Sequence, residues 1–160
     1  MRELIITRIF NAPCKLVWKA WTEPEYVKNW WGPKDFTCPD AKIDFRVGGK
    51  YILCMRGPAG TDFEKDYWST GEYIEIIPMK KIVVKDSFAD EKGNVVPATN
   101  YGIQGFPLEL QVAITFEEVE DDKTKMTLNY PTVGDIDETM FKNMNQGWNQ
   151  SLDKFAEVLK

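Results

Sequence analysis

The chain has 160 residues, which suits one domain spanning residues 1–160 that buries about two thirds of the surface its unfolded chain exposes. It carries 20 Lys and Arg against 25 Asp and Glu, and it has no histidine. The net charge of −5, with no long basic run, argues against nucleic acid or an anionic membrane surface as a partner. The lack of histidine excludes Ser-His-Asp and Cys-His catalysis and nearly all catalytic zinc sites.

Targeting and redox signals are absent from the sequence. No segment approaches the roughly 20 apolar residues of a membrane span, and the N-terminus lacks the features of a secretory signal, so we expect a cytoplasmic protein. Cys14, Cys38 and Cys54 are odd in number and widely spaced, which argues against a disulfide framework. We interpret them as small buried hydrophobic residues, and we expect neither a metal nor a cofactor.

The first elements in chain order are a strand and two short helices. Residues 4–10 are β-branched and aromatic and predict the strand. A helix is predicted to follow. Asn11 is a good N-cap residue for it, and Pro13 is tolerated in a first helical turn. Residues 22–25 match a capping box that opens the second helix.

The run Asn29-Trp30-Trp31-Gly32-Pro33 ends this helical region. One interpretation is that the two tryptophans anchor the core beneath a loop, and the other is that they wall a cavity between the helices and a sheet. Exposing them would cost about 25 cal/mol per Å² of apolar surface. We therefore expect at least one of them to be largely buried.

From residue 36 the apolar period changes to two, which indicates strands. The predicted strands are residues 36–47, 50–56, 67–77, 81–88, 108–116 and 125–130. Gly48-Gly49 and Pro78-Met79-Lys80 predict hairpin turns between the first two pairs. One-sided alternation predicts an antiparallel sheet with one buried face. The irregular segment 89–107 is a candidate lid or mobile loop.

A long helix is predicted for residues 137–159. An apolar stripe runs along it through Met144, Trp148, Leu152, Phe155 and Leu159. At 1.5 Å per residue the helix spans about 33 Å, enough to cross a small sheet. The expected order is therefore strand, two helices, six strands, long helix.

Several short motifs accompany this order. They are Asn11-Ala12-Pro13, Trp30-Trp31-Gly32-Pro33, Gly48-Gly49, Met55-Arg56-Gly57-Pro58, Phe116-Glu117-Glu118 and Gly147-Trp148-Asn149-Gln150-Ser151-Leu152. With them the chain resembles, from about residue 4 to 159, the family of activators of the heat-shock protein 90 ATPase and their homologues, in the START-like, Bet v allergen-like superfamily.

The resemblance implies an α+β helix-grip fold: a curved seven-stranded antiparallel sheet wrapped around a long C-terminal helix, with two short helices between strands 1 and 2. It does not imply one activity, because the superfamily includes lipid carriers, hormone receptors, cyclases and co-chaperone domains.

The same elements predict a cavity between the sheet and the long helix, although the same side chains would also make a filled core. Strand parity places Glu72, with Trp68 and Ile74, and Asp86 on the inner face. Two carboxylates in an apolar space would have raised pKa values and could act as acid and base or bind a polar group. The alternatives are an error of register or a wet cavity mouth. Arg56 is expected to form a surface ion pair, with Asp44 or a ligand carboxylate as candidate partners.

Three functions follow. The first is non-catalytic binding of a small hydrophobic molecule, such as a lipid; the second is a cyclase or hydrolase-type enzyme using cavity carboxylates; the third is a co-chaperone module that engages a heat-shock protein in a stress response. The sequence leaves open whether the protein forms a homodimer. The predicted ligand-binding residues are Trp30, Trp31, Phe36, Trp68, Glu72, Ile74, Asp86, Phe88, Leu110, Val112, Met126, Met144 and Trp148.

Overall fold

The computed structural model describes residues 2–160. Its elements are β1 (Leu4–Phe10), α1 (Cys14–Thr22), α2 (Pro24–Val27), β2 (Thr37–Ile43), β3 (Lys50–Arg56), β4 (Asp66–Ile77), β5 (Lys81–Ala89), the 3₁₀ helix η1 (Ala98–Tyr101), β6 (Leu110–Glu120), β7 (Lys123–Tyr130) and α3 (Glu138–Val158). The predicted order of strand, two helices, six strands and long helix is confirmed.

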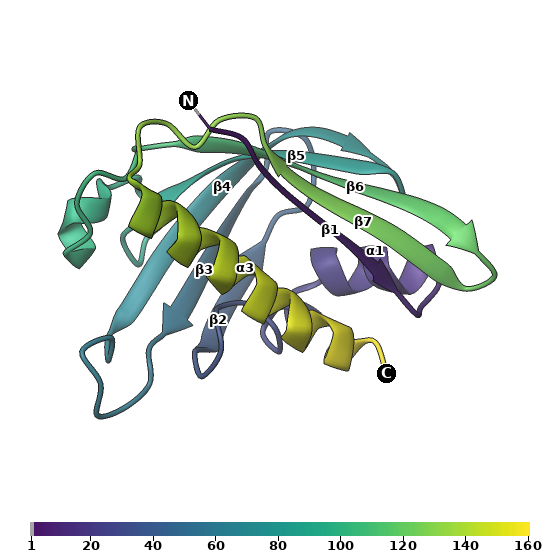
Figure 1. The fold of residues 1–160 in the computed structure, drawn as a ribbon, viewed down its shortest axis with the longest axis horizontal. Helices are drawn as coiled ribbons and strands as arrows, with labels where there is room; N and C mark the ends of the chain where they lie inside the picture. Colours follow the sequence, from purple (N-terminus) through teal and green to yellow (C-terminus); the bar gives the residue numbers. More distant parts are fainter. Residues whose placement is uncertain (1) are drawn as a thin grey trace.

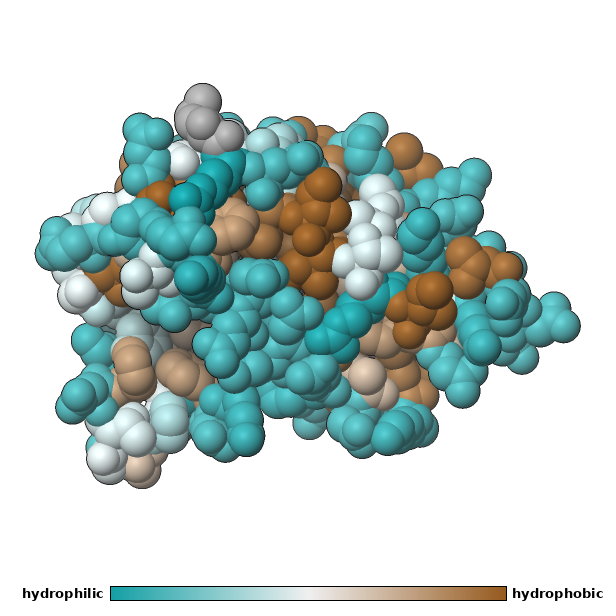
Figure 2. Space-filling view, in the orientation of Figure 1, coloured by the Kyte–Doolittle hydropathy of each residue, from teal (hydrophilic) through white to brown (hydrophobic). Residues whose placement is uncertain are grey.

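The seven strands form one antiparallel sheet in the order β1-β7-β6-β5-β4-β3-β2. The sheet curls into a half-barrel, and α3 crosses its concave face (Figure 1). This is the helix-grip fold that the family resemblance implied. Figure 2 shows that the face of α3 turned away from the sheet is hydrophilic, as expected of a helix that buries one apolar stripe.

Some local predictions at the element ends are wrong. Asn11 does not cap α1, because the helix begins one position after Pro13, which occupies the cap without a side-chain hydrogen bond. The Thr22 hydroxyl donates to the carbonyl of Trp18, 2.9 Å away, and so does not cap α2. Leu108 precedes β6 and is exposed, whereas the inward alternation begins at Leu110.

A β-bulge in β4 reverses the predicted parity of that strand. The register with β5 shifts between Tyr73 and Glu75, which leaves Ile74 as an extra residue. Ile76 faces inward as predicted. On the N-terminal side of the bulge, however, the next inward side chain is that of Tyr73 and not that of Ile74. Glu72 and Ile74 are exposed, so the expectation that they face the cavity is wrong.

The second half of α3 and the Trp30 side chain lie in the hydrophobic core. Trp30 is 1% exposed, its ring packs against Trp21 of α1 and Phe155 of α3, and its Nε1 donates to the carbonyl of Ala20. The expectation that at least one ring of the Trp30-Trp31 pair is buried is therefore confirmed.

Within residues 2–160, no helix combines the length and the apolar character needed to cross a bilayer.

The two halves of α3 are packed differently. No residue between 138 and 150 is fully buried, whereas Ser151, Leu152 and Phe155 are. The Asp137 side chain caps the N-terminus by accepting from the backbone amide of Met140 at 2.8 Å.

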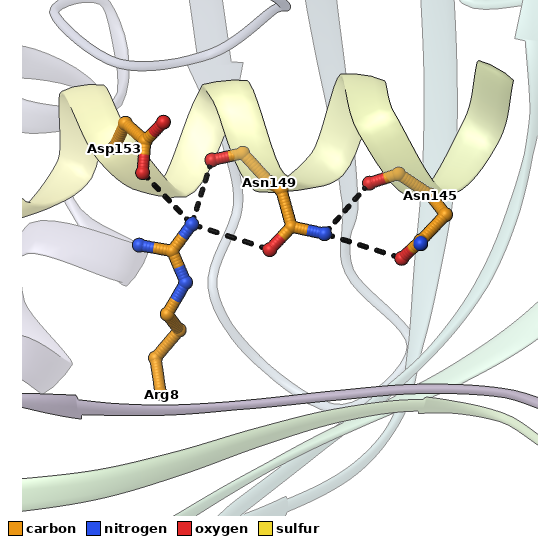
Figure 3. A network of polar contacts seen from close by, with 4 residues as sticks. All are labelled: Arg8, Asn145, Asn149 and Asp153. Atoms are coloured by element: carbon orange, nitrogen blue, oxygen red, sulfur yellow. Dashed lines mark hydrogen bonds and ion pairs between the residues drawn. The ribbon is translucent and has the colours of Figure 1, made fainter. Parts of the chain in front are cut away.

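A polar network fixes the middle and second half of α3 to the edge strand β1 (Figure 3). The Arg8 guanidinium donates to the carbonyl and side-chain oxygens of Asn149, at 2.9 and 3.2 Å, and pairs with Asp153 at 2.8 Å. The Asn149 amide in turn donates to Asn145. These contacts hold α3 across the sheet.

Candidate functional site

A pocket of about 450 Å³ lies between the concave face of the sheet and the first half of α3. This size falls within the range typical of small-molecule sites. Its wall is mainly aromatic and aliphatic: Trp31, Gly32, Pro33, Met55, Phe63, Tyr67, Trp68, Ser69, Asp86, Ser87, Phe88, Ile103, Phe106, Leu110, Tyr130, Met140, Asn143, Met144, Gly147, Trp148 and Ser151.

A second, smaller cavity of about 40 Å³ lies deeper beneath α3. It has room for no more than a few water molecules. Four residues line both spaces: Trp31, Asp86, Tyr130 and Trp148. The interior is therefore nearly filled around the small cavity and open beneath the first half of α3. Each of the two alternatives, a filled core and a cavity, holds for one part of it.

Asp86 is the only charged side chain among residues 2–160 that lines either space. β5 carries it inward without a bulge, as parity predicted, between Val84 and Phe88. The Tyr51 hydroxyl donates to its Oδ1 at 2.6 Å. Burial raises the pKa of Asp86 to about 6, and the hydrogen bonds from Tyr51 and the Ser87 backbone offset only part of that rise.

Tyr130 places a second polar group beside this carboxyl. Its hydroxyl accepts from Nε1 of Trp148 at 3.0 Å, and burial raises its pKa well above the usual value. The hydroxyl proton has no acceptor among the hydrogen bonds of residues 2–160. The deep wall of the pocket thus presents a carboxylate acceptor and a hydroxyl donor on an otherwise apolar surface.

The segment 89–107, predicted as a candidate lid, begins with the last residue of β5 and supplies Ile103 and Phe106 to the pocket wall. It is fixed to the sheet by Tyr101, whose hydroxyl donates to the carbonyl of Ala89 and accepts from the backbone amide of Trp68. The Phe106 ring also packs against Phe88, 5.7 Å between centroids. In this structure the segment forms a wall of the pocket.

The structure brings most of the predicted residues to one of the two spaces. Trp31, Trp68, Asp86, Phe88, Leu110, Met144 and Trp148 line the larger pocket, and Trp30 and Val112 line the smaller cavity. Met126 is fully buried in the core, and Phe36 packs against Phe63 and Tyr67 outside both linings.

Sequence reasoning missed Tyr51, Tyr67 and Tyr73 as lining residues. For β4 the reason is the bulge, which exchanges the two faces of the strand. The register of the sheet shows why Tyr51 faces inward. Asp86 pairs with Gly71, Gly71 pairs with Tyr51, and residues that pair directly lie on the same face of the sheet.

The remaining polar candidates lie outside the site. Arg56 pairs with Asp66 at 2.7 Å on the surface, which confirms the ion pair but not Asp44 as its partner.

The cysteines also lie outside the site. Burial raises the pKa of the Cys38 and Cys54 thiols to about 11 and about 12. Both are buried and Cys14 is partly exposed. No group of three or more Cys, Asp and Glu side chains within residues 2–160 is arranged to hold a metal ion.

Comparisons with known proteins agree with this architecture. The family model described as activator of Hsp90 ATPase homolog 1-like protein matches residues 11–160. A search of curated proteins finds no match.

Solved structures share the fold over nearly the whole chain. A protein from Chromobacterium violaceum is 22% identical with a TM-score of 0.76, covering 99% of this chain and 98% of that one. A protein from Arthrobacter aurescens is 27% identical, with a TM-score of 0.74 and coverage of 98% and 85%. The AHSA1 protein from Silicibacter pomeroyi is 19% identical, with a TM-score of 0.74 and coverage of 99% and 97%.

Proposed function

Because the chain belongs to the family of activator of Hsp90 ATPase homolog 1-like proteins, within the START-like superfamily, we propose that it binds a small apolar molecule beneath α3 without transforming it. The observation that supports this proposal is the open pocket of about 450 Å³ with a mainly aromatic wall. Apolar burial would supply most of the affinity, and the polar groups of Asp86 and Tyr130 would orient the ligand.

A neutral fluorescent probe, N-phenyl-1-naphthylamine, tests the proposal. We expect saturable binding with a stoichiometry near one and quenching of tryptophan emission, because Trp31 and Trp148 line the pocket. Non-saturable binding, or a stoichiometry well above one, would count against a defined site.

A pair of variants on α3 locates the binding. Met144 lines the pocket, so Met144→Trp should fill part of it and weaken probe binding at least about tenfold. This corresponds to a loss of about 1.4 kcal/mol in binding free energy. Gln146 is exposed and lies outside the lining, so Gln146→Trp adds the same bulk on the outer side and should leave binding unchanged. Equal effects of the two variants would place the probe elsewhere.

An enzymatic role for this pocket would rest on a single carboxylate, Asp86, with the hydroxyls of Tyr51 and Tyr130, because Glu72 faces outward and the predicted pair of cavity carboxylates is absent from residues 2–160. This favours binding over catalysis. A lipid as the ligand, a heat-shock protein as the partner, a role in the stress response and a cytoplasmic location stay predictions.

A further inference from the structure

The deep wall of the pocket surrounds one acidic group with aromatic rings. Tyr51, Trp31, Trp148 and Tyr130 lie in series, with neighbouring ring centroids 6.4, 5.6 and 6.5 Å apart, and all four line the small cavity with Asp86. The negative faces of aromatic rings and an anionic carboxylate attract the same class of ligand group, an organic cation.

Nothing within residues 2–160 supplies a counter-charge to Asp86. The linings of both spaces contain no Lys or Arg, and the pKa of Asp86 is raised by burial with no cation opposing it. Buried charges in folded proteins are ordinarily paired with an opposite charge. The hydrogen bonds from Tyr51 and the Ser87 backbone bring no positive charge, so the place of a cationic partner beside Asp86 is open to a ligand. At pH 7 and above the carboxyl is mostly ionised, since its pKa is about 6.

Building on the pocket of the proposed function, we infer that its ligand carries a protonated amine, whose ammonium group pairs with Asp86 inside the aromatic wall while the apolar remainder fills the space beneath α3. A ligand carboxylate would meet the negative charge of Asp86 with no Lys or Arg beside it, so the site selects against fatty acids and other organic anions.

Three probes with one apolar body test this selectivity: 2-naphthylmethylammonium, 2-naphthylmethanol and 2-naphthoate, titrated calorimetrically into the full chain. At pH 8 we expect the ammonium to bind about tenfold more tightly than the alcohol, and the carboxylate more weakly than the alcohol. Equal affinities for the ammonium and the alcohol, or a preference for the carboxylate, would overturn the inference.

Asp86→Asn removes the charge and keeps the shape. The variant should bind the ammonium and the alcohol about equally, whereas the matched control Glu72→Gln removes an exposed carboxylate on the outer face and should keep the preference. A preference that survives Asp86→Asn would show that another group selects the cation. Circular dichroism of each variant checks that the fold is retained.

The pH dependence provides an independent readout. At pH 5 about a tenth of a carboxyl with a pKa of about 6 is ionised, and the neutral site should still bind the ammonium about as weakly as the alcohol. Affinity for the ammonium should therefore fall about fivefold from its value at pH 8, while affinity for the alcohol stays the same. The other titratable groups that line the two spaces are Tyr51 on β3, Tyr67 and Tyr73 on β4, and Tyr130 on β7. Burial raises the pKa of each, so they stay neutral over this range. The first half of α3 and the segment 90–107 contribute no charged side chain to the lining.

The results separate this inference from the proposed function. If neither N-phenyl-1-naphthylamine nor any of the three probes binds, the proposed function fails and the inference fails with it. If the neutral probe and the alcohol bind but the ammonium has no advantage, the pocket stands as an apolar site and only the inference is overturned.

Discussion

Replacing Asp86 by Asn should stabilise the protein at neutral pH. The folded chain holds this carboxyl at a pKa of about 6, against an ordinary value of 3.8. A raised pKa in the folded state means that the folded protein retains a proton between about pH 4 and 6 after the unfolded chain has released it. Stability is therefore lost as the pH rises through that window, and the full cost is present above it.

The size of the effect follows from the difference of about two in pKa, which corresponds to about 3 kcal/mol. Asn keeps an oxygen to accept from Tyr51, but its amide adds donors that need partners. We therefore expect Asp86→Asn to raise the free energy of unfolding by about 1 to 3 kcal/mol at pH 7.5.

Urea denaturation at pH 4, 5, 6 and 7.5 measures the effect. The difference between Asp86→Asn and the wild type should grow across these values and level off above pH 6. Glu72→Gln, on the exposed face, should stay within about 0.5 kcal/mol of the wild type throughout. A difference that does not change with pH, or a wild type more stable than the variant at pH 7.5, would refute the assignment of a buried, uncompensated carboxylate.

Three further changes test the packing of α3. Phe155→Ala should cost about 3 to 5 kcal/mol in urea denaturation because this side chain is fully buried, whereas Trp148→Ala should cost less because part of its ring borders open space; equal costs would argue against the open pocket. Gly147→Ala should stabilise the folded protein by up to about 1 kcal/mol and raise the thermal midpoint, since the added methyl group makes only an ordinary contact with Pro33. A lower midpoint would show that α3 lies closer to Pro33 than this contact allows. Arg8→Met should cost about 1 kcal/mol by loss of its hydrogen bonds to Asn149, and an unchanged unfolding midpoint would assign those bonds no net stability.

The fold follows from periodicity because the signals are long and repeated. The stripe ending at Phe155 and Leu159 predicted α3 to within a residue at each end, and the alternation through Val112 predicted β6 and its inner face. The resemblance to a family supplied the way in which these elements assemble.

The site was predicted only in part, since it depends on details that periodicity does not encode. A bulge of one residue at Ile74 exchanged the faces of β4 and removed Glu72 from the interior. Asp86 was placed correctly because β5 runs without interruption. The hydrogen bond from Tyr51 joins strands that are not neighbours in the sheet, and no local pattern shows such a contact.

For the proposed ligand, the unequal packing of α3 would separate entry from folding stability. The half before residue 150 carries no fully buried side chain of its own, whereas loosening the half that carries Leu152 and Phe155 would open the core. Amide hydrogen exchange should accordingly be faster in the first half, through local openings that leave the rest of the molecule intact. Under the proposed function, substitutions near Met144 should therefore alter which molecules bind and how fast, with little loss of folding stability.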